Sequence, residues 1–168
     1  MWPWTVPVIA LRARGCLDQK KVQAMMAPTR LHKEAGAGSR MLVTMSSNKS
    51  VREAANALQV AVEANHFGVM QVHNLKETMA KKGIALANEC LIFEVCQPQQ
   101  AKRVLQENMS VSTALPCRIS VYEENGKTVL AALKPTTLLA TFDTPQLETV
   151  AQEVENTIMK IMKEAASE

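Results

Sequence analysis

Aromatic side chains are scarce in this sequence of 168 residues, which holds two Trp, one Tyr and three Phe. Ten methionines supply part of the apolar volume instead, and methionine packs adaptably because its side chain is unbranched. This composition predicts a pliable core rather than an aromatic box around a cofactor. No apolar run approaches the roughly 20 residues that a membrane helix needs, so we expect a soluble protein without a membrane partner.

The sequence also lacks the short motifs of several enzyme classes. It has no glycine-rich phosphate loop, Walker motif, nucleophile elbow or HExxH motif, which disfavours ATP, dinucleotide and zinc-protease chemistry. Its cysteines form no CxxC pair and no cluster with histidine at zinc-finger spacing. The sequence therefore indicates no particular cofactor or metal and leaves open whether the protein is an enzyme. Because its apolar periodicity is regular, it needs no disulfide staples, and we expect reduced thiols and a cytoplasmic location.

Positive charge is concentrated at one end of the chain. The formal net charge is +3, but residues 1–40 hold seven Lys or Arg and two acids, whereas residues 41–168 hold twelve Lys or Arg and fourteen acids. A nucleic-acid-binding domain would need a basic face on its folded part, with aromatic platforms or a known motif. The sequence shows neither of these, so we expect no nucleic-acid partner.

Residues 1–40 differ from the rest of the chain in their patterning. They open with Met1-Trp2-Pro3-Trp4 and continue with scattered basic and small residues. A secretory signal would place positive charge before its apolar region, and here the order is reversed. We expect this segment to be a disordered or loosely packed leader, or an extension upstream of a natural start at Met41. Regular patterning begins at Met41 and predicts a single domain over residues 41–168.

After Met41, apolar periodicity predicts an alternation of strands and helices. Ser50-Val51-Arg52-Glu53 is a capping box, in which the two outer side chains satisfy free backbone N–H groups at a helix start. Pro98 suits the first turn of a helix, where its missing N–H group loses no hydrogen bond. The expected strands are residues 42–45, 67–72 and 91–96, and the expected helices are residues 51–65, residues 75–82 and a segment that starts at Pro98.

The second half of the domain is expected to form a hairpin followed by helices. Residues 117–122 alternate between apolar and polar side chains, and Asn125-Gly126 is a hairpin turn signal that returns the chain through residues 128–133. Pro135 opens a short helix, and Thr144-Pro145 caps a long amphipathic one. These elements predict an α+β fold with a small antiparallel or mixed sheet, helices packed mainly on one face, and a long amphipathic C-terminal helix.

Three sequence motifs point to a known family. They are the stretch from His73 to Ile84, the segment Val95-Cys96-Gln97-Pro98, and Leu115-Pro116-Cys117. Together with the first and last amphipathic helices, they make the span from about Met41 to Ala165 resemble the bacterial and archaeal domain-of-unknown-function family 302. One difference is Gln97, where the family usually has Asn. The resemblance implies a small α+β domain that forms homodimers, and it implies no activity.

Cys96 and Cys117 flank one short helix and are the main candidate site residues. Cys96 lies just before a helix N-terminus, whose dipole and free N–H groups stabilise a thiolate. Cys117 shares a strand face with Ile119 and Val121, which points to the core. Both cysteines could instead be small buried hydrophobic residues, since free cysteine is among the most buried residue types. If the two strands are antiparallel neighbours, the thiols approach each other, whereas in parallel neighbours they lie at opposite ends.

Three charged or titratable residues are further candidates for ligand binding. Glu94 shares the side of Cys96 by alternation and could hold a metal or act as a base, although a solvated residue on an edge strand is the simpler interpretation. His73 could reach a pocket or be a satisfied turn histidine. Arg118 lies on the face opposite Cys117, where it could bind an anion or cover the sheet.

Three functions are compatible with these features. The first is a homodimeric binding module that holds a small ligand or a soft metal near Cys96 and Cys117. The second is a thiol-based redox or sulfur-transfer protein, with Cys96 as nucleophile and Cys117 as resolving thiol. The third is a structural interaction domain that uses the long C-terminal helix as its interface. An unactivated Cys96 thiol would count against the second function.

Overall fold

A five-stranded sheet forms the centre of the domain. The computed structural model describes residues 41–167, and the predictions for residues 1–40 lie outside the described residues. The strand order is β1-β5-β4-β3-β2, and every neighbouring pair is antiparallel. The predicted α+β class is therefore confirmed, with a purely antiparallel sheet. The strands are β1 (Leu42–Ser47), β2 (Gly68–Asn74), β3 (Cys90–Cys96), β4 (Cys117–Glu124) and β5 (Lys127–Leu133).

Helices occupy the connections that the sequence assigned to them. The order of strand, helix, strand, helix, strand, helix, hairpin and further helices agrees with the prediction. No helix within residues 41–167 is both long and apolar enough to cross a membrane. The helices are α3 (Val51–Ala64), α4 (Leu75–Ala80), α5 (Pro98–Glu107), α6 (Pro135–Leu139) and α7 (Leu147–Ala166), with short 3-10 segments η1 (Met109–Ala114) and η2 (Ala140–Phe142).

The predicted capping box begins α3. The Glu53 N–H donates to Ser50 Oγ over 3.3 Å, and the Ser50 N–H donates to Glu53 Oε2 over 2.8 Å. The side-chain and backbone hydrogen bonds from Ser50 hold the pKa of Glu53 below its ordinary value. The apolar residues of α3 then recur at helical spacing and are buried, so the helix has one face to place against the sheet.

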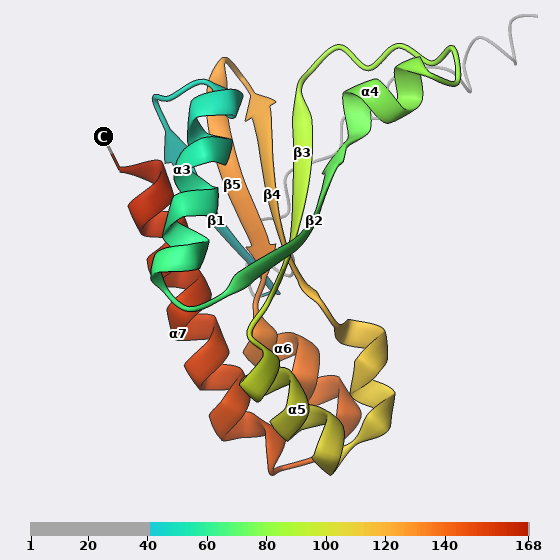
Figure 1. Cartoon of the computed structure of the whole chain (residues 1–168), viewed down its shortest axis with the longest axis vertical. Coiled ribbons are helices and arrows are strands. Elements are labelled where there is room, and N and C mark those ends of the chain that lie inside the picture. The colour runs from blue at the N-terminus through green and yellow to red at the C-terminus, as the bar shows by residue number, and fades with distance from the viewer. Residues whose placement is uncertain (1–40, 168) are drawn as a thin grey trace, which may run out of the picture. The chain divides into compact units, whose positions relative to one another are not determined.

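α3 and α7 lie side by side over one face of the sheet (Figure 1). The predicted packing of helices mainly on one face is thus confirmed. The main core lies between these two helices and the alternate residues of the strands that point toward them. Its largest fully buried side chains are Leu58, Val62, Val95, Ile119, Val121, Leu130, Ile161 and Met162.

The start of α7 differs from the prediction. The helix begins at Leu147, and no side chain caps its first turn. Thr144 accepts a hydrogen bond from Asn108 Nδ2 over 3.1 Å and donates to the Phe142 carbonyl over 2.9 Å. Thr144 is therefore engaged in contacts with the loop and with α5's C-terminal cap, and it lies two residues before Gln146, the N-cap position of α7.

A second, smaller core lies beyond one end of the sheet. It is formed by α5, η1, α6 and the N-terminal half of α7, which lie together below the strands in Figure 1. Asn108 ends α5, and its Oδ1 accepts the Ser110 N–H that begins η1. The buried members of this second core are Val104, Val111, Leu139, Leu147, Val150 and Ala151. The end of the sheet and this second core together enclose the candidate site.

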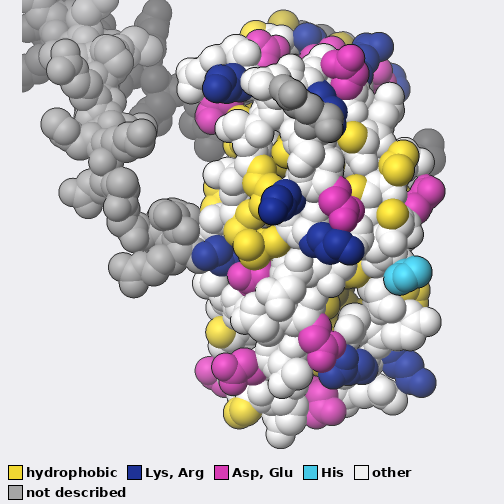
Figure 2. Space-filling model, turned by 90° about the vertical axis from the view of Figure 1, so that its left-hand side faces the viewer, with side chains coloured by type: hydrophobic (Ala, Val, Ile, Leu, Met, Phe, Trp, Pro, Cys, Tyr) yellow, Lys and Arg dark blue, Asp and Glu magenta, His cyan; other side chains and the backbone are white. Residues whose placement is uncertain are grey.

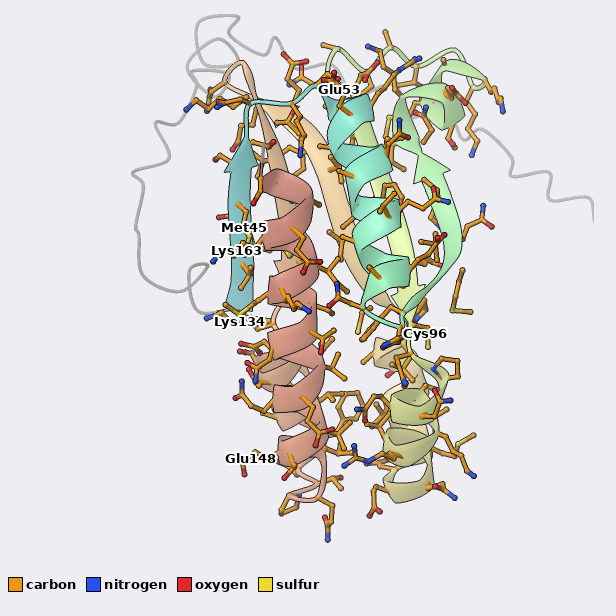
Figure 3. All side chains as sticks on the ribbon, turned by 60° about the vertical axis from the view of Figure 1, so that its left-hand side comes forward. Met45, Glu53, Cys96, Lys134, Glu148 and Lys163 are labelled. Carbon is orange, nitrogen blue, oxygen red and sulfur yellow. The ribbon has the colours of Figure 1, made fainter. Side chains whose placement is uncertain are left out.

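The outer surface of the helical side is mixed in charge. Figure 2 shows Lys and Arg interspersed with Asp and Glu on the side formed by α7, α3 and β1, with hydrophobic side chains gathered near the centre. Met45, Lys134 and Lys163 lie toward β1 in this region (Figure 3). This side of the domain therefore presents no broad field of one sign.

Candidate functional site

Cys96 and Cys117 lie at the same end of two paired strands. β3 and β4 are antiparallel neighbours, and Cys117 pairs directly with Val95, the residue before Cys96. Figure 3 shows Cys96 at the junction between β3 and α5. Of the two arrangements that the sequence left open, the structure has the antiparallel one, in which both cysteines lie at the same end of the sheet. Cys90 pairs with Tyr122 at the far end of β3 and takes no part in this site.

A cavity of about 230 Å³ lies between this end of the sheet and the second core, and both thiols line it. α5 forms one wall, η1 and α6 form others, and Val154 of α7 also lines the cavity. The remaining apolar lining residues are Phe67, Val95, Ala101, Val104, Ala114, Leu115, Pro116, Leu133, Pro135, Leu138 and Leu139. The polar lining residues are fewer, namely Gln97, Gln100, Thr113 and Arg118. This combination of an apolar wall with a few polar groups is typical of small-molecule sites.

Both thiols of the cavity are held in their neutral form. Burial, and to a smaller extent the nearby Cys96, raise the pKa of Cys117 to about 11. Burial also raises the pKa of the Cys96 thiol. Both residues line the same cavity, and each is a free thiol. At neutral pH the cavity therefore contains two weakly polar thiols rather than a thiolate.

Cys96 lies just before the start of α5, as expected, but its surroundings do not favour a thiolate. Gln97 is the N-cap of α5, and its Oε1 accepts the Gln100 N–H over 2.6 Å. One of the N–H groups that could have stabilised a thiolate is thus already paired with a side chain. What remains at Cys96 is the effect of burial, which disfavours the charged form.

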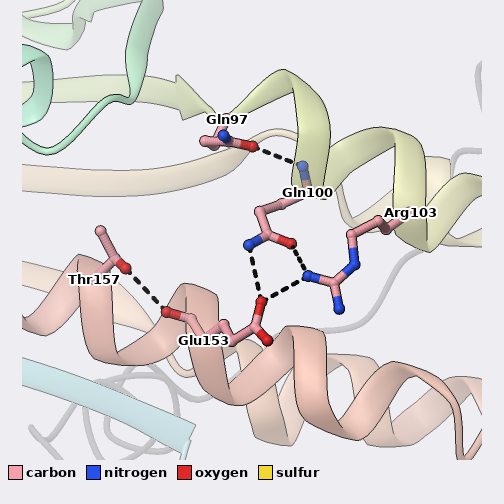
Figure 4. A network of polar contacts seen from close by, with 5 residues as sticks. All are labelled: Gln97, Gln100, Arg103, Glu153 and Thr157. Carbon is pink, nitrogen blue, oxygen red and sulfur yellow. Dashed lines mark hydrogen bonds and ion pairs between the residues drawn. The ribbon is translucent and has the colours of Figure 1, made fainter.

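A polar network joins α5 to α7 beside the cavity (Figure 4). Gln100 Nε2 donates to Glu153 Oε2 over 3.0 Å, and Arg103 Nη1 donates to the same oxygen over 2.6 Å. Arg103 Nη1 also donates to Gln100 Oε1 over 2.7 Å. The hydrogen bond from Arg103, and then the one from Gln100, hold the pKa of Glu153 below its ordinary value. The network fixes the lining residue Gln100 and holds α5 against α7 along one wall of the cavity.

Glu94 joins His73 and Arg118 across three strands. Glu94 Oε1 lies 3.2 Å from His73 Nε2 and 3.5 Å from Arg118 Nε. The prediction of a solvated residue on an edge strand is wrong, because β3 lies between β2 and β4 and the Glu94 side chain is only 20% exposed. His73 likewise lies within β2 rather than in a turn. Of these three residues, Arg118 alone lines the cavity.

The structure also shows which site residues the sequence did not reveal. Gln100, Thr113 and Leu138 line the cavity, yet none belongs to a recognisable motif. The only available signal was the apolar edge of α5, which includes Ala101 and Val104. Within residues 41–167, no group of three or more His, Cys, Asp or Glu side chains is placed to hold a metal ion. A metal in this cavity would have to rely on the two thiols.

Fold and site together define a small antiparallel α+β domain with a thiol-lined cavity at one end of its sheet. The family described as "Domain of unknown function DUF302" matches residues 43–165, and the chain belongs to this family. A solved structure, described as the crystal structure of an uncharacterized conserved DUF302 protein from Bacillus stearothermophilus, is similar with a TM-score of 0.72 and 31% identity. The match covers 74% of this chain and 98% of that one. None of the curated proteins compared with the chain matches it.

Proposed function

We propose that this domain is a small-ligand binding module whose site is the cavity between Cys96 and Cys117. The observation that carries the proposal is that a single cavity of about 230 Å³ is lined by both signature cysteines. Concave, mostly apolar pockets with a few convergent polar groups are the usual form of ligand sites. The raised pKa values of both thiols favour binding over thiol catalysis, because a nucleophilic cysteine needs its thiolate.

The volume limits the size of the ligand. A water molecule takes about 30 Å³ in the liquid, and we take the same volume for a methylene group, so the cavity has room for about eight non-hydrogen atoms. Hexanamide, a neutral molecule of this size, is a suitable probe. Larger molecules would have to extend out of the cavity or displace one of its walls.

Filling the cavity is expected to abolish probe binding. Ala101 lines the cavity from α5, so Ala101→Phe places a ring in the space a ligand would use. We expect its affinity for hexanamide to fall at least about tenfold relative to wild type, with a stability cost of roughly 1–3 kcal/mol from overpacking. NMR titration of the full chain measures the affinity through the backbone signals of the lining residues.

A matched variant separates occupation of the cavity from the effect of a new ring. Gln99 is exposed on the same helix and does not line the cavity, so Gln99→Phe should bind hexanamide as wild type does. If Ala101→Phe fails to fold, Leu138→Phe fills the same space from α6. Unchanged affinity in the filled variants would refute a ligand site in this cavity.

We further infer that the domain forms a homodimer. The family resemblance supports this, as do exposed apolar side chains near the cavity. Leu42 and Leu133 are cross-strand partners that are 41% and 49% exposed, and Leu133 also lines the cavity. Native mass spectrometry of the purified protein is expected to show twice the chain mass at micromolar concentration. A monomer at every concentration tested would contradict the dimer.

A soft metal held by both thiols is the second candidate, favoured by the presence of both thiols in the lining of one cavity. Binding of Cu(I) would require both to lose their protons, which their raised pKa values oppose at neutral pH. The same native mass spectrum separates the candidates, because a bound metal adds its own mass and removes two protons. The raised pKa values also disfavour the thiol redox function, because that function needs a thiolate.

The structure gives no support to an interaction domain that uses α7 as its interface, because the apolar stripe of α7 is already buried inside the domain.

A further inference from the structure

We infer that the cavity selects a short-chain organic carboxylate, with its carboxylate at Arg118 and Gln97 and its apolar chain inside. This inference rests on the proposed function and adds the chemical class of the ligand. It depends on three features of the lining, namely one cation at the opening, unused hydrogen-bond donors beside it, and an otherwise uncharged wall.

Arg118 is the cation at the opening. Its side chain lines the cavity but is 64% exposed, so it stands where the cavity meets solvent. Its Nε lies 3.5 Å from Glu94 Oε1, whereas its terminal nitrogens make no hydrogen bond with any residue of the described part of the chain. A guanidinium can bind one carboxylate through Nε and present its other N–H groups to a second. Glu94 therefore positions Arg118 and leaves its outer edge available.

Gln97 supplies further donors. Because its Oε1 accepts the Gln100 N–H, the orientation of its amide is fixed, and the other end of the amide is the NH₂ group. That nitrogen makes no contact in the network of Figure 4, and no hydrogen bond to it occurs within residues 41–167. Gln97 and Arg118 both line the cavity and both have donors without a partner in the described part of the chain, and donors select a ligand that accepts hydrogen bonds.

The rest of the lining suits an uncharged chain. Arg118 is the only charged side chain among the described lining residues, and Glu94, whose carboxylate pairs with Arg118 Nε, does not line the cavity itself. The two thiols are neutral and tolerate apolar contact. With room for about eight non-hydrogen atoms, the cavity matches a carboxylate that has about six carbons in all.

Hexanoate and hexanamide test this inference, because they have the same size and differ in charge. We expect the wild-type full chain at pH 7.5 to bind hexanoate about five- to tenfold more tightly than hexanamide, the gain being limited by the exposure of Arg118. In Arg118→Gln the two affinities should agree within about twofold. Arg52 is also exposed and paired with a glutamate, but it lies outside the cavity, so Arg52→Gln should keep the wild-type preference.

The outcomes distinguish this inference from the function on which it rests. Equal wild-type affinities for the two probes, both lost in Ala101→Phe, would overturn the carboxylate assignment and leave the cavity as a ligand site. A preference for hexanoate that survives in Arg118→Gln would also overturn it. If neither probe binds the wild-type chain, the proposed function fails together with the inference.

Discussion

Cys117 in the folded protein is expected to react with iodoacetamide about one hundredfold more slowly at pH 7.5 than a cysteine of the unfolded chain. Burial, and to a smaller extent Cys96, raise its pKa from 9.0 to about 11. At a pH below both of these pKa values, each unit by which the pKa rises lowers the thiolate fraction tenfold. Peptide mapping of the labelled full chain, folded and in urea, measures the rate at each cysteine. The pKa of Cys96 is raised by less than that of Cys117, so Cys96 should be labelled before Cys117.

The same shift makes stability depend on alkaline pH. A thiol with a raised folded-state pKa contributes stability that is fully present below pH 9 and is lost as the pH rises to about 11. The loss attributable to Cys117 is about 2 to 3 kcal/mol at the upper end of this window. The free energy of unfolding should therefore fall less between pH 8 and pH 11 in Cys117→Ala than in the wild type, because the variant has no thiol at this position. Equal labelling rates in the folded and unfolded chains, or identical pH profiles of the two proteins, would contradict the prediction.

Leu58→Ala is expected to lower the free energy of unfolding by about 3 to 4 kcal/mol. Leu58 is fully buried where α3 packs against the sheet and α7, and removing its side chain loses apolar burial and leaves a cavity in the main core. Urea denaturation followed by circular dichroism measures the change. A loss of this size would take a large fraction of the stability of an ordinary domain.

Val60 provides the control for this substitution. It lies on the same helix two residues along, but its side chain is 68% exposed. Val60→Ala should change stability by less than about 0.5 kcal/mol, because it loses little burial and alanine favours the helix. A similar loss in both variants would show that helix α3, rather than the packing of Leu58, had been disturbed.

The order of elements could be predicted because local chemistry determines it. The capping box at Ser50 starts α3 as expected, and Asn125 and Gly126 both adopt the positive φ angles that a tight hairpin turn requires. Thr144 shows the limit of such signals. Its pattern suited a helix cap, but the contact with Asn108, 36 residues away in sequence, engages it elsewhere. Tertiary contacts of this kind leave no trace in local sequence.

The pairing of the strands determines which residues come together at the candidate site, and the sequence does not specify this pairing. The segment between Cys96 and Cys117 is long enough for a parallel crossover, so the sequence allows the two cysteines to lie at the same end of the sheet or at opposite ends. The sequence favours an edge strand for Glu94, because nothing local shows that β2 pairs on the other side of β3. The cavity is harder still to foresee. It is the space left between two cores, and it depends on how α5, α6 and η1 pack rather than on any motif.

The walls of the cavity come from segments distributed between Phe67 and Val154, so the cavity exists only when the whole domain is folded. A molecule that occupies it would bind the native state and not the unfolded chain. Binding would then raise the melting temperature, by a stabilisation of about 2.7 kcal/mol at a free concentration one hundred times the dissociation constant. Thermal-shift screening of small carboxylates and other metabolite-sized molecules can therefore search for the natural ligand without an assay for any activity.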